Sequence, residues 1–213
     1  MTRNTALRLL ALILATLLVL PATSDPEFGI GGLFILWGLV TALLGILFIA
    51  LWGTENSGLS APGEIAGLLA REKARFVSAQ NPERYVVGAD QTLALGTRLF
   101  SKPAGRAQAA EQLRLLAGGT HELHSAIAVA RDGKLLFAGV SVARMTMRHL
   151  SGSGIEAYLD QAGEAVTTSV GAYQLEGLGV HLFERIEGDH FTILGLPLLP
   201  LLAFLREQGL LGV

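Results

Sequence analysis

The sequence predicts an α/β domain over residues 61–213, preceded by a hydrophobic helical hairpin over residues 1–60. Charge divides the chain at this point, because residues 1–60 hold only five charged side chains: Arg3, Arg8, Asp25, Glu27 and Glu55. The remainder mixes helical and strand-like stretches, which is the pattern of an α/β fold. It contains no internal repeat and no low-complexity tract.

Two long uncharged stretches predict the hairpin. The second, 33-LFILWGLVTALLGILFIALW-52, is long enough to cross a hydrocarbon core of about 30 Å as a helix. The first also resembles a signal peptide, but 21-PATSDPEF-28 has no clear A-x-A cleavage pattern. Basic residues flank the pair on both sides, which predicts that both ends lie in the cytoplasm. We expect residues 9–52 to anchor a cytoplasmic domain at the inner membrane; a cleaved signal and a buried helical pair of a soluble protein are the alternatives.

Composition excludes several classes of function. The formal net charge of −2 offers no basic excess for the phosphates of an extended DNA or RNA, so nucleic-acid binding is disfavoured. A small anionic ligand is compatible with this charge. The chain has no cysteine, which rules out disulfides, thiolate nucleophiles and cysteine-based zinc sites.

The first elements of the α/β part follow from local patterns. Ser60, Pro62 and Glu64 resemble a helix start, and an apolar stripe carries this helix to Gln80. The stretch 85-YVVGA-89 predicts a short buried strand that ends at Asp90, and 92-TLALGTRLF-100 predicts a hairpin around its glycine.

The later elements are a helix, a hairpin and three further segments. Alanine and leucine content predicts a helix over residues 104–116, which Gly118 and Gly119 end. Two alternating strands flank the turn 131-RDG-133, and we expect them over residues 121–130 and 134–147. The rest is predicted as a helix, a strand and a last helix, over residues 155–162, 180–186 and 198–208.

Three groups of polar residues could carry chemistry. A carboxylate at a strand end can hold Mg²⁺ and a lysine near a helix N-terminus can meet phosphate, which singles out Asp90 and Lys102. The run 121-HELH-124 is one residue short of H-E-x-x-H, and a strand would point its first two side chains to opposite faces, so zinc is disfavoured. No nucleophile motif accompanies Asp189 and His190, so we predict a turn or capping role for this pair.

Six segments, in this order and spacing, resemble the Maf family, also called septum-formation-inhibitor-like proteins. They are 87-VGADQTL-93, 101-SKP-103, 113-LRLLAGGTHEL-123, 158-YLDQAGE-164, 171-GAYQLEGLG-179 and 184-ERIEGDHFTILGLPL-198. The resemblance implies a Maf/inosine-triphosphatase-like mixed sheet with flanking helices. It also implies a nucleoside triphosphate pyrophosphatase, in which a divalent metal, Mg or Mn, helps water to split the bond between the α- and β-phosphates.

The resemblance also implies roles for individual residues. The aspartate of the family's G-A-D motif falls on Asp90, which would accept a proton and contact the metal. The lysine of the K-P motif falls on Lys102, which would bind phosphate. Glu187 and Asp189 are weaker candidates near the metal, and the segment 171-GAYQLEGLG-179 would lie against the nucleotide.

The chain departs from the family at positions that matter for the substrate. Gln91 stands where the family usually has threonine, and Glu176 stands where it usually has glutamine. Both positions are linked with base choice, so we expect both residues to bind substrate. The family lysine of D-K-A-G-A-Y is absent from 168-TSVGAY-173, and nothing matches the family's first strand with its S-x-S-P-R-R loop. Because that loop contributes to phosphate binding, we expect slow turnover or none.

Two hypotheses of different classes result. The first is a membrane-tethered or chimeric nucleotide pyrophosphatase that acts on non-standard or pyrimidine nucleotides. The alternative is a catalytically inactive Maf-like module for nucleotide binding or a division-related interaction. A homodimer is considered for both. Because a carboxylate only accepts hydrogen bonds, Glu176 should favour a base edge that offers donors.

Overall fold

The structure is a computed structural model that describes residues 61–212. The predicted hydrophobic hairpin and the membrane anchor at residues 9–52 lie outside the described residues. Within residues 61–212, no helix combines the length and the apolar character that a membrane span needs.

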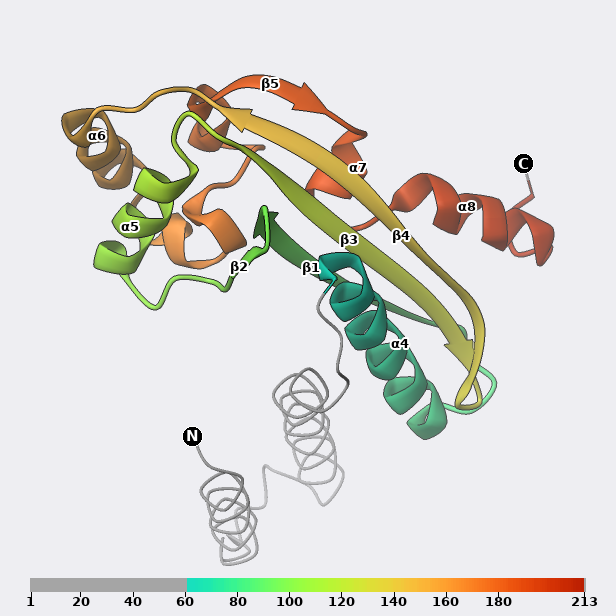
Figure 1. Ribbon diagram of the computed structural model, residues 1–213. Helices are drawn as coiled ribbons and strands as arrows, with labels where there is room; N and C mark the ends of the chain where they lie inside the picture. The colour runs from blue at the N-terminus through green and yellow to red at the C-terminus, as the bar shows by residue number, and fades with distance from the viewer. Residues whose placement is uncertain (1–60, 213) are drawn as a thin grey trace, which may run out of the picture. The chain divides into compact units, whose positions relative to one another are not determined.

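A five-stranded sheet forms the centre of the described chain (Figure 1). The strands lie in the order β2-β1-β3-β4-β5, and their bounds are β1 (Val86–Leu95), β2 (Arg98–Phe100), β3 (Thr120–Arg131), β4 (Lys134–Met147) and β5 (Phe183–Glu187). Every neighbouring pair in this sheet is antiparallel. The resemblance implied a mixed sheet, but short turns reverse the chain between β1 and β2 and between β3 and β4. The long connections that lead to β3 and to β5 also bring these strands in antiparallel to β1 and β4.

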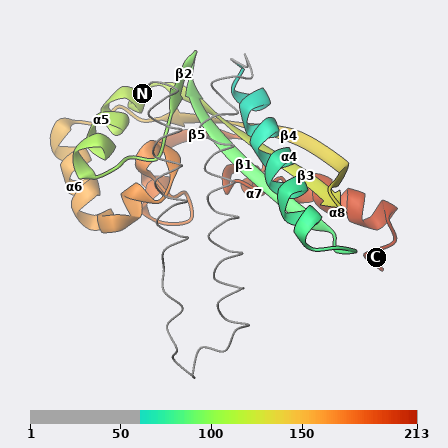
Figure 2. The same cartoon turned by 90° about the horizontal axis from the view of Figure 1, so that it is seen from below.

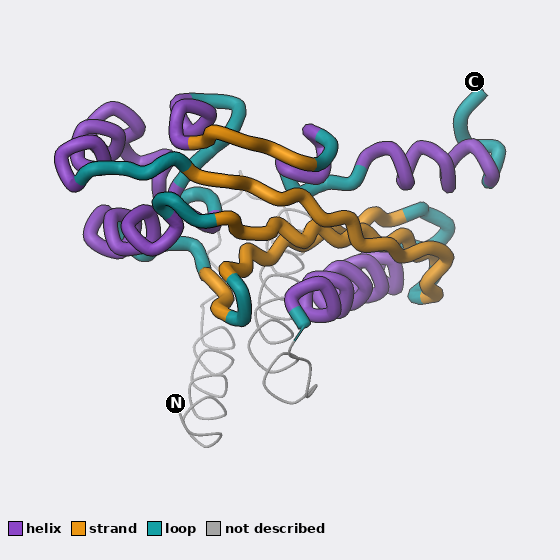
Figure 3. Tube along the Cα trace, turned by 45° about the horizontal axis from the view of Figure 1, so that its top comes forward, coloured by secondary structure: helices purple, strands orange, loops and turns teal. Residues whose placement is uncertain are grey.

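Helices flank the sheet, as the sequence predicts. One face packs against the long helix α4 (Pro62–Gln80), which runs along the strands (Figure 2). The helices α5 (Arg106–Leu116) and α6 (Gly152–Ala162) gather at one end of the sheet, and α8 (Leu198–Glu207) lies at the other end (Figures 1 and 3). The short α7 (His190–Ile193) precedes α8, and the three 3-10 turns are Gly163–Thr167, Val170–Ala172 and Leu178–Leu182.

Strand β3 belongs to all three clusters of buried residues, because successive side chains of a strand point to opposite faces. Its leucine Leu123 packs with residues of α5 and α6, whereas Ile127 and Val129 pack with residues of α8. On the opposite face of β3, three alanines pack against alanines of α4; this cluster consists of Ala66, Ala70, Ala74, Ala126, Ala128 and Ala130.

The backbone of α4 lies very close to β1 at Gly88. A Cβ atom on Gly88 would lie 2.3 Å from the carbonyl oxygen of Ala70 and 2.7 Å from the nitrogen of Ala74. Real carbon atoms do not approach backbone atoms so closely, so this position has room for glycine alone. The small residues therefore set the distance between α4 and the sheet.

The predicted elements agree well with the observed ones, with three differences. The β3–β4 hairpin is confirmed, and its turn residues Asp132 and Gly133 both have positive φ, as a tight hairpin turn requires. Asp90 does not end a strand, because β1 continues to Leu95 and keeps pairing with β3 up to Ala94. The last strand starts only at Phe183, after a 3-10 turn, and the short helix α7 was not predicted.

The variant Gly88→Ala tests the close approach of α4. Because the new methyl group would overlap the backbone of α4, we expect the free energy of unfolding to fall by about 1–3 kcal/mol. Urea denaturation measures this change. Gly152→Ala is the matched control, since a Cβ atom there meets nothing within 4 Å. Equal unfolding midpoints for the two variants would contradict the packing described above.

Candidate active site

Asp90 lies on the face of β1 that α4 covers. Lys73 of α4 forms an ion pair with the carboxylate of Asp90, and its Nζ also donates to the carbonyl oxygen of Ala89 at 3.3 Å. The side chains of Lys73 and Asp90 are 28% and 16% exposed, so solvent still reaches the pair. The position of Lys73 follows from the helix, because the neighbouring Ala74 packs against the sheet and holds this part of α4 close to β1. A carboxylate and a cation thus lie together at this point of β1.

Gln91 points to the opposite face of β1 and fastens α7 to the sheet. Its Nε2 donates to Ser125 Oγ at 2.8 Å and to the carbonyl oxygens of Thr192 and Ile193, both at 3.1 Å. Three acceptors thus share the two hydrogens of this amide group. Only the oxygen Oε1 of Gln91 is left to meet a ligand, and it can only accept.

Gln91 and Glu176 line the same pocket, which brings together the two departures from the family that are linked with base choice. The pocket has a volume of about 160 Å³. Its lining residues come from β1, β3, the loop before β5 and α7; they are Gln91, Leu123, Ser169, Val170, Tyr173, Gln174, Leu175, Glu176, Ile193 and Leu194. A larger hollow of about 510 Å³ lies between α5 and α6, but its lining includes none of the predicted site residues.

The glycines of 171-GAYQLEGLG-179 serve the packing of this pocket wall. Gly171 has a φ of +82°, and a Cβ atom on it would lie 2.6 Å from Leu93 Cδ1. A Cβ atom on Gly179 would lie 2.3 Å from the carbonyl oxygen of Gln174. Both glycines therefore approach other parts of the protein, whereas contact of this segment with a nucleotide stays a prediction.

Behind the pocket wall, His121 and Tyr173 form a buried hydrogen-bonded pair. His121 Nε2 lies 2.7 Å from Tyr173 Oη, and the rings of both residues also pack against Phe183. The imidazole is fully buried, and its Nδ1 has no hydrogen-bond partner within residues 61–212. Burial lowers the pKa of His121 to about 4 and raises the pKa of Tyr173. Both groups are therefore neutral near pH 7.

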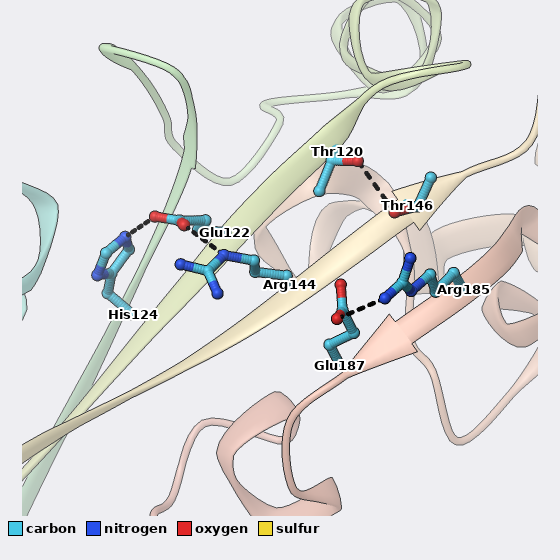
Figure 4. Close-up of polar contacts among 7 residues, drawn as sticks. All are labelled: Thr120, Glu122, His124, Arg144, Thr146, Arg185 and Glu187. Carbon is cyan, nitrogen blue, oxygen red and sulfur yellow. Dashed lines mark hydrogen bonds and ion pairs between the residues drawn. The ribbon is translucent and has the colours of Figure 1, made fainter.

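The other polar residues of 121-HELH-124 lie on the opposite face of β3, as strand geometry predicts. There Glu122 accepts a hydrogen bond from Arg144 Nε at 3.0 Å, and His124 Nε2 lies 3.0 Å from its other oxygen (Figure 4). Since Glu122 already pairs with these two residues and His121 faces away, the strand does not gather the three side chains as metal ligands.

Lys102 lies in the loop between β2 and α5. It is exposed, and it forms no ion pair with any of the residues that the structure describes. The structure therefore leaves its ammonium group available to a ligand, but it does not bring Lys102 into contact with Asp90.

Glu187 and Asp189 are placed differently from Asp90. Glu187 is on β5, with β3 and β4 between it and β1, and it accepts a hydrogen bond from Arg185 at 2.8 Å (Figure 4). Asp189 caps α7, as predicted: it accepts from the backbone nitrogen of Thr192 at 3.1 Å and from the hydroxyl of the same residue. The hydroxyl contact is the main reason why the pKa of Asp189 is lowered.

A divalent metal fits this site only together with a phosphate ligand. Residues 61–212 contain no group of three or more His, Asp or Glu side chains that could hold a metal ion. Mg²⁺, however, is commonly bound by one or two carboxylates with the remaining ligands supplied by substrate phosphates and water. Asp90 could supply one carboxylate oxygen in such a set.

Residues 50–208 match the family model described as Maf-like protein. The chain belongs to the Maf family. The Maf domain is 73% identical over 157 residues to a nucleoside triphosphate pyrophosphatase of Bradyrhizobium diazoefficiens, which covers 74% of this chain and 78% of that protein.

Two further relatives extend the comparison. A nucleoside triphosphate pyrophosphatase of Rhodopseudomonas palustris is 70% identical to the Maf domain over 159 residues, covering 75% of this chain and 79% of that protein. The 7-methyl-GTP pyrophosphatase of Rhizobium etli is 55% identical over 155 residues, covering 73% and 77% of the two chains.

Lys73 and the His121–Tyr173 pair are not among the residues predicted from the sequence. A signal for Lys73 exists, because Ala66, Ala70 and Ala74 recur every four residues and mark the face of α4 that meets the sheet. Lys73 lies beside that face. No comparable signal exists for the pair, because its two residues are 52 positions apart and meet only through the fold.

His121 should make the stability of the Maf domain depend on pH. The unfolded state takes up a proton on this residue below about pH 6.5, whereas the folded state does so only near pH 4. Stability is therefore complete above pH 6.5 and falls as the pH drops, by about 2 kcal/mol at pH 5.

Urea denaturation at pH 7.5, 6 and 5 measures this loss. In His121→Phe, the free energy of unfolding should fall less between pH 7.5 and pH 5 than in the wild type. The control His181→Gln, at an exposed position, should show the same fall as the wild type. Parallel pH curves for His121→Phe and the wild type would show that His121 does not titrate in this way.

Proposed function

We propose that this Maf domain is a nucleoside triphosphate pyrophosphatase that converts a nucleoside triphosphate into the monophosphate and diphosphate. Two of the relatives carry this name, and the carboxylate of Asp90, the ammonium group of Lys73 and the pocket lined by Gln91 all lie at one point of β1, which supports the proposal. The metal cofactor, the base preference and the roles of single residues are part of the proposal.

The arrangement of Asp90 and Gln91 carries the proposal. These consecutive residues point to opposite faces of β1, so the pocket lies on one face and the Asp90–Lys73 pair on the other. Strand β2 pairs with β1 only at Leu93, Ala94 and Leu95. Within the described residues, the outer edge of β1 at Asp90 is thus free of a strand partner. A base in the pocket could therefore extend its phosphates around this edge to Asp90.

The proposed chemistry is hydrolysis of a phosphoanhydride bond. Asp90 accepts a proton from a water molecule, whose oxygen attacks the α-phosphorus, and the bond to the β-phosphate breaks to release diphosphate. Lys73 and Lys102 offer ammonium groups to the phosphate oxygens. A divalent cation held by Asp90 and the phosphates would neutralise the charge that develops on the leaving group.

The pocket should prefer a base with hydrogen-bond donors on its edge. Glu176 can only accept, and Gln91 has only its oxygen free. A guanine-type base suits this pair, because its ring N–H and its amino group both donate. The relative from Rhizobium etli, named a 7-methyl-GTP pyrophosphatase, supports a guanine-type substrate.

Asp90→Asn tests the proton acceptor. Because the amide cannot take up the proton, we expect diphosphate release to fall by about 100-fold or more, with the melting temperature little changed. The assay measures diphosphate from GTP with Mg²⁺ or Mn²⁺. The control is Asp160→Asn, which changes an exposed carboxylate of α6. Equal turnover of Asp90→Asn and the wild type would exclude Asp90 as the acceptor, and a wild type that binds GTP without hydrolysing it would favour the inactive binding module.

Glu176→Gln tests the reading of the base. An amide can donate as well as accept, so this variant should lose about 5- to 150-fold of the preference for guanine-type over uracil-type bases. The measurement compares kcat/KM for GTP, 7-methyl-GTP, UTP and dTTP. Glu184→Gln is the control, since Glu184 is exposed on β5 and does not line the pocket. An unchanged order of preference would show that Glu176 does not contact the base.

A further inference from the structure

Gln112 of α5 is one of five buried polar or charged residues in the described chain, and the proposed chemistry gives it no role. The whole residue is 6% exposed. A buried side-chain amide is costly unless its donors and its acceptor find partners. The partners of Gln112 therefore show what this residue does in the fold.

The two ends of the Gln112 amide bind two different loops. Its Nε2 donates to the carbonyl oxygen of Ser101 at 2.8 Å, and its Oε1 accepts from the backbone nitrogen of Gly171 at 3.2 Å. Ser101 and Gly171 are thus joined by one rigid amide group, although they belong to segments far apart in the sequence. Because both partners are backbone groups, the bonds fix the course of the chain on both sides.

Both loops lead directly to groups of the proposed site. Ser101 immediately precedes Lys102, the predicted phosphate ligand. Gly171 opens the segment that supplies Tyr173 and Glu176 to the pocket wall, and it packs tightly against Leu93 of β1. A shift of α5 would therefore move the lysine loop and the pocket wall together.

We propose that Gln112 is a positioning residue, which holds Lys102 at a fixed place relative to the pocket so that base and phosphates are bound at the same time. This inference rests on the proposed function, since it takes the pocket and Lys102 as parts of one nucleotide site. Gln112 itself does not touch the reacting atoms.

The main test is Gln112→Met, which keeps the length of the side chain and removes both hydrogen bonds. We expect triphosphate affinity to fall about 10-fold, while the affinity for the nucleoside, which has no phosphate for Lys102, changes less. Binding is measured by calorimetry with a non-hydrolysable GTP analogue and with guanosine. Gln161→Met, at an exposed position of α6, is the matched control and should bind both ligands like the wild type.

A double-mutant cycle with Lys102→Met separates positioning from plain stabilisation. If Gln112 acts through Lys102, the double variant should bind the triphosphate little more weakly than Lys102→Met alone. If the two losses multiply instead, Gln112 does not act through Lys102 and the inference is overturned.

The conservative variant Gln112→Glu covers the case that Gln112→Met fails to fold. A protonated carboxyl group can still donate to Ser101 and accept from Gly171, whereas the ionised form cannot donate. Affinity relative to the wild type at the same pH should therefore recover as the pH is lowered from 8 to 6. A ratio that does not change with pH would count against the bridge.

Hydrogen exchange makes the outcome independent of activity. In Gln112→Met, the amide of Gly171 and the amides of Ser101, Lys102 and Ala104 should lose protection together, compared with Gln161→Met. If only one loop is affected, the bridge does not couple them. If the wild type binds no nucleotide, the proposed function fails and this inference fails with it. If the wild type binds nucleotide but the binding losses of Gln112→Met and Lys102→Met are independent, only the inference about Gln112 is rejected.

Discussion

The contact between the backbone of α4 and the sheet is the constraint on which the site depends. Glycine on β1 and alanines on both surfaces leave no space for larger groups, so the helix has only one distance at which it can pack. That distance brings the flexible side chain of Lys73 to the carboxylate of Asp90. The small side chains between α4 and the sheet thus determine where Lys73 meets Asp90.

The two faces of β1 divide the chemistry between them. On one face, a carboxylate and an ammonium group are close together and accessible to water, which suits reactions of phosphates. On the other face, the donors of Gln91 are consumed by α7, and the pocket keeps acceptors. Gln91, whose position the resemblance links with base choice, therefore also holds α7 against the sheet. Replacing Gln91 would disturb α7 as well as any contact with a base.

Local signals predicted much of the fold. The β3–β4 hairpin followed from alternation and from the Asp-Gly turn, and the turn or capping role of Asp189 followed from the lack of a nucleophile motif beside it. The strand direction of the sheet did not follow, because it depends on which strands meet across long connections. The end of β1 was misplaced at Asp90 since a charged residue resembles a strand end, whereas Lys73 neutralises it inside the sheet.

The candidate site was predicted only in part for the same reason. Motif resemblance pointed to Asp90, Gln91 and Glu176, and the structure brings the last two into one pocket. The alanine repeat of α4 could have placed Lys73 near the sheet, but its partner Asp90 and the two partners of Gln112 come from distant segments, which no local pattern identifies. The metal candidates Glu187 and Asp189 came from the resemblance and stay predictions; in the structure, Glu187 pairs with Arg185 and Asp189 caps α7.

The length of the β3–β4 hairpin has a consequence for how the domain folds. Both strands contribute to the buried cluster that includes α5 and α6 and to the buried cluster that includes α8, and β3 also packs against α4. All three clusters contain residues of β3, so the loss of packing in one cluster exposes residues of a strand on which the other two depend. Residues 61–212 should therefore unfold in a single cooperative transition rather than as separate lobes. The hairpin itself closes through a tight turn between neighbours in sequence, so it is suited to form early and to provide the surface on which the helices then assemble.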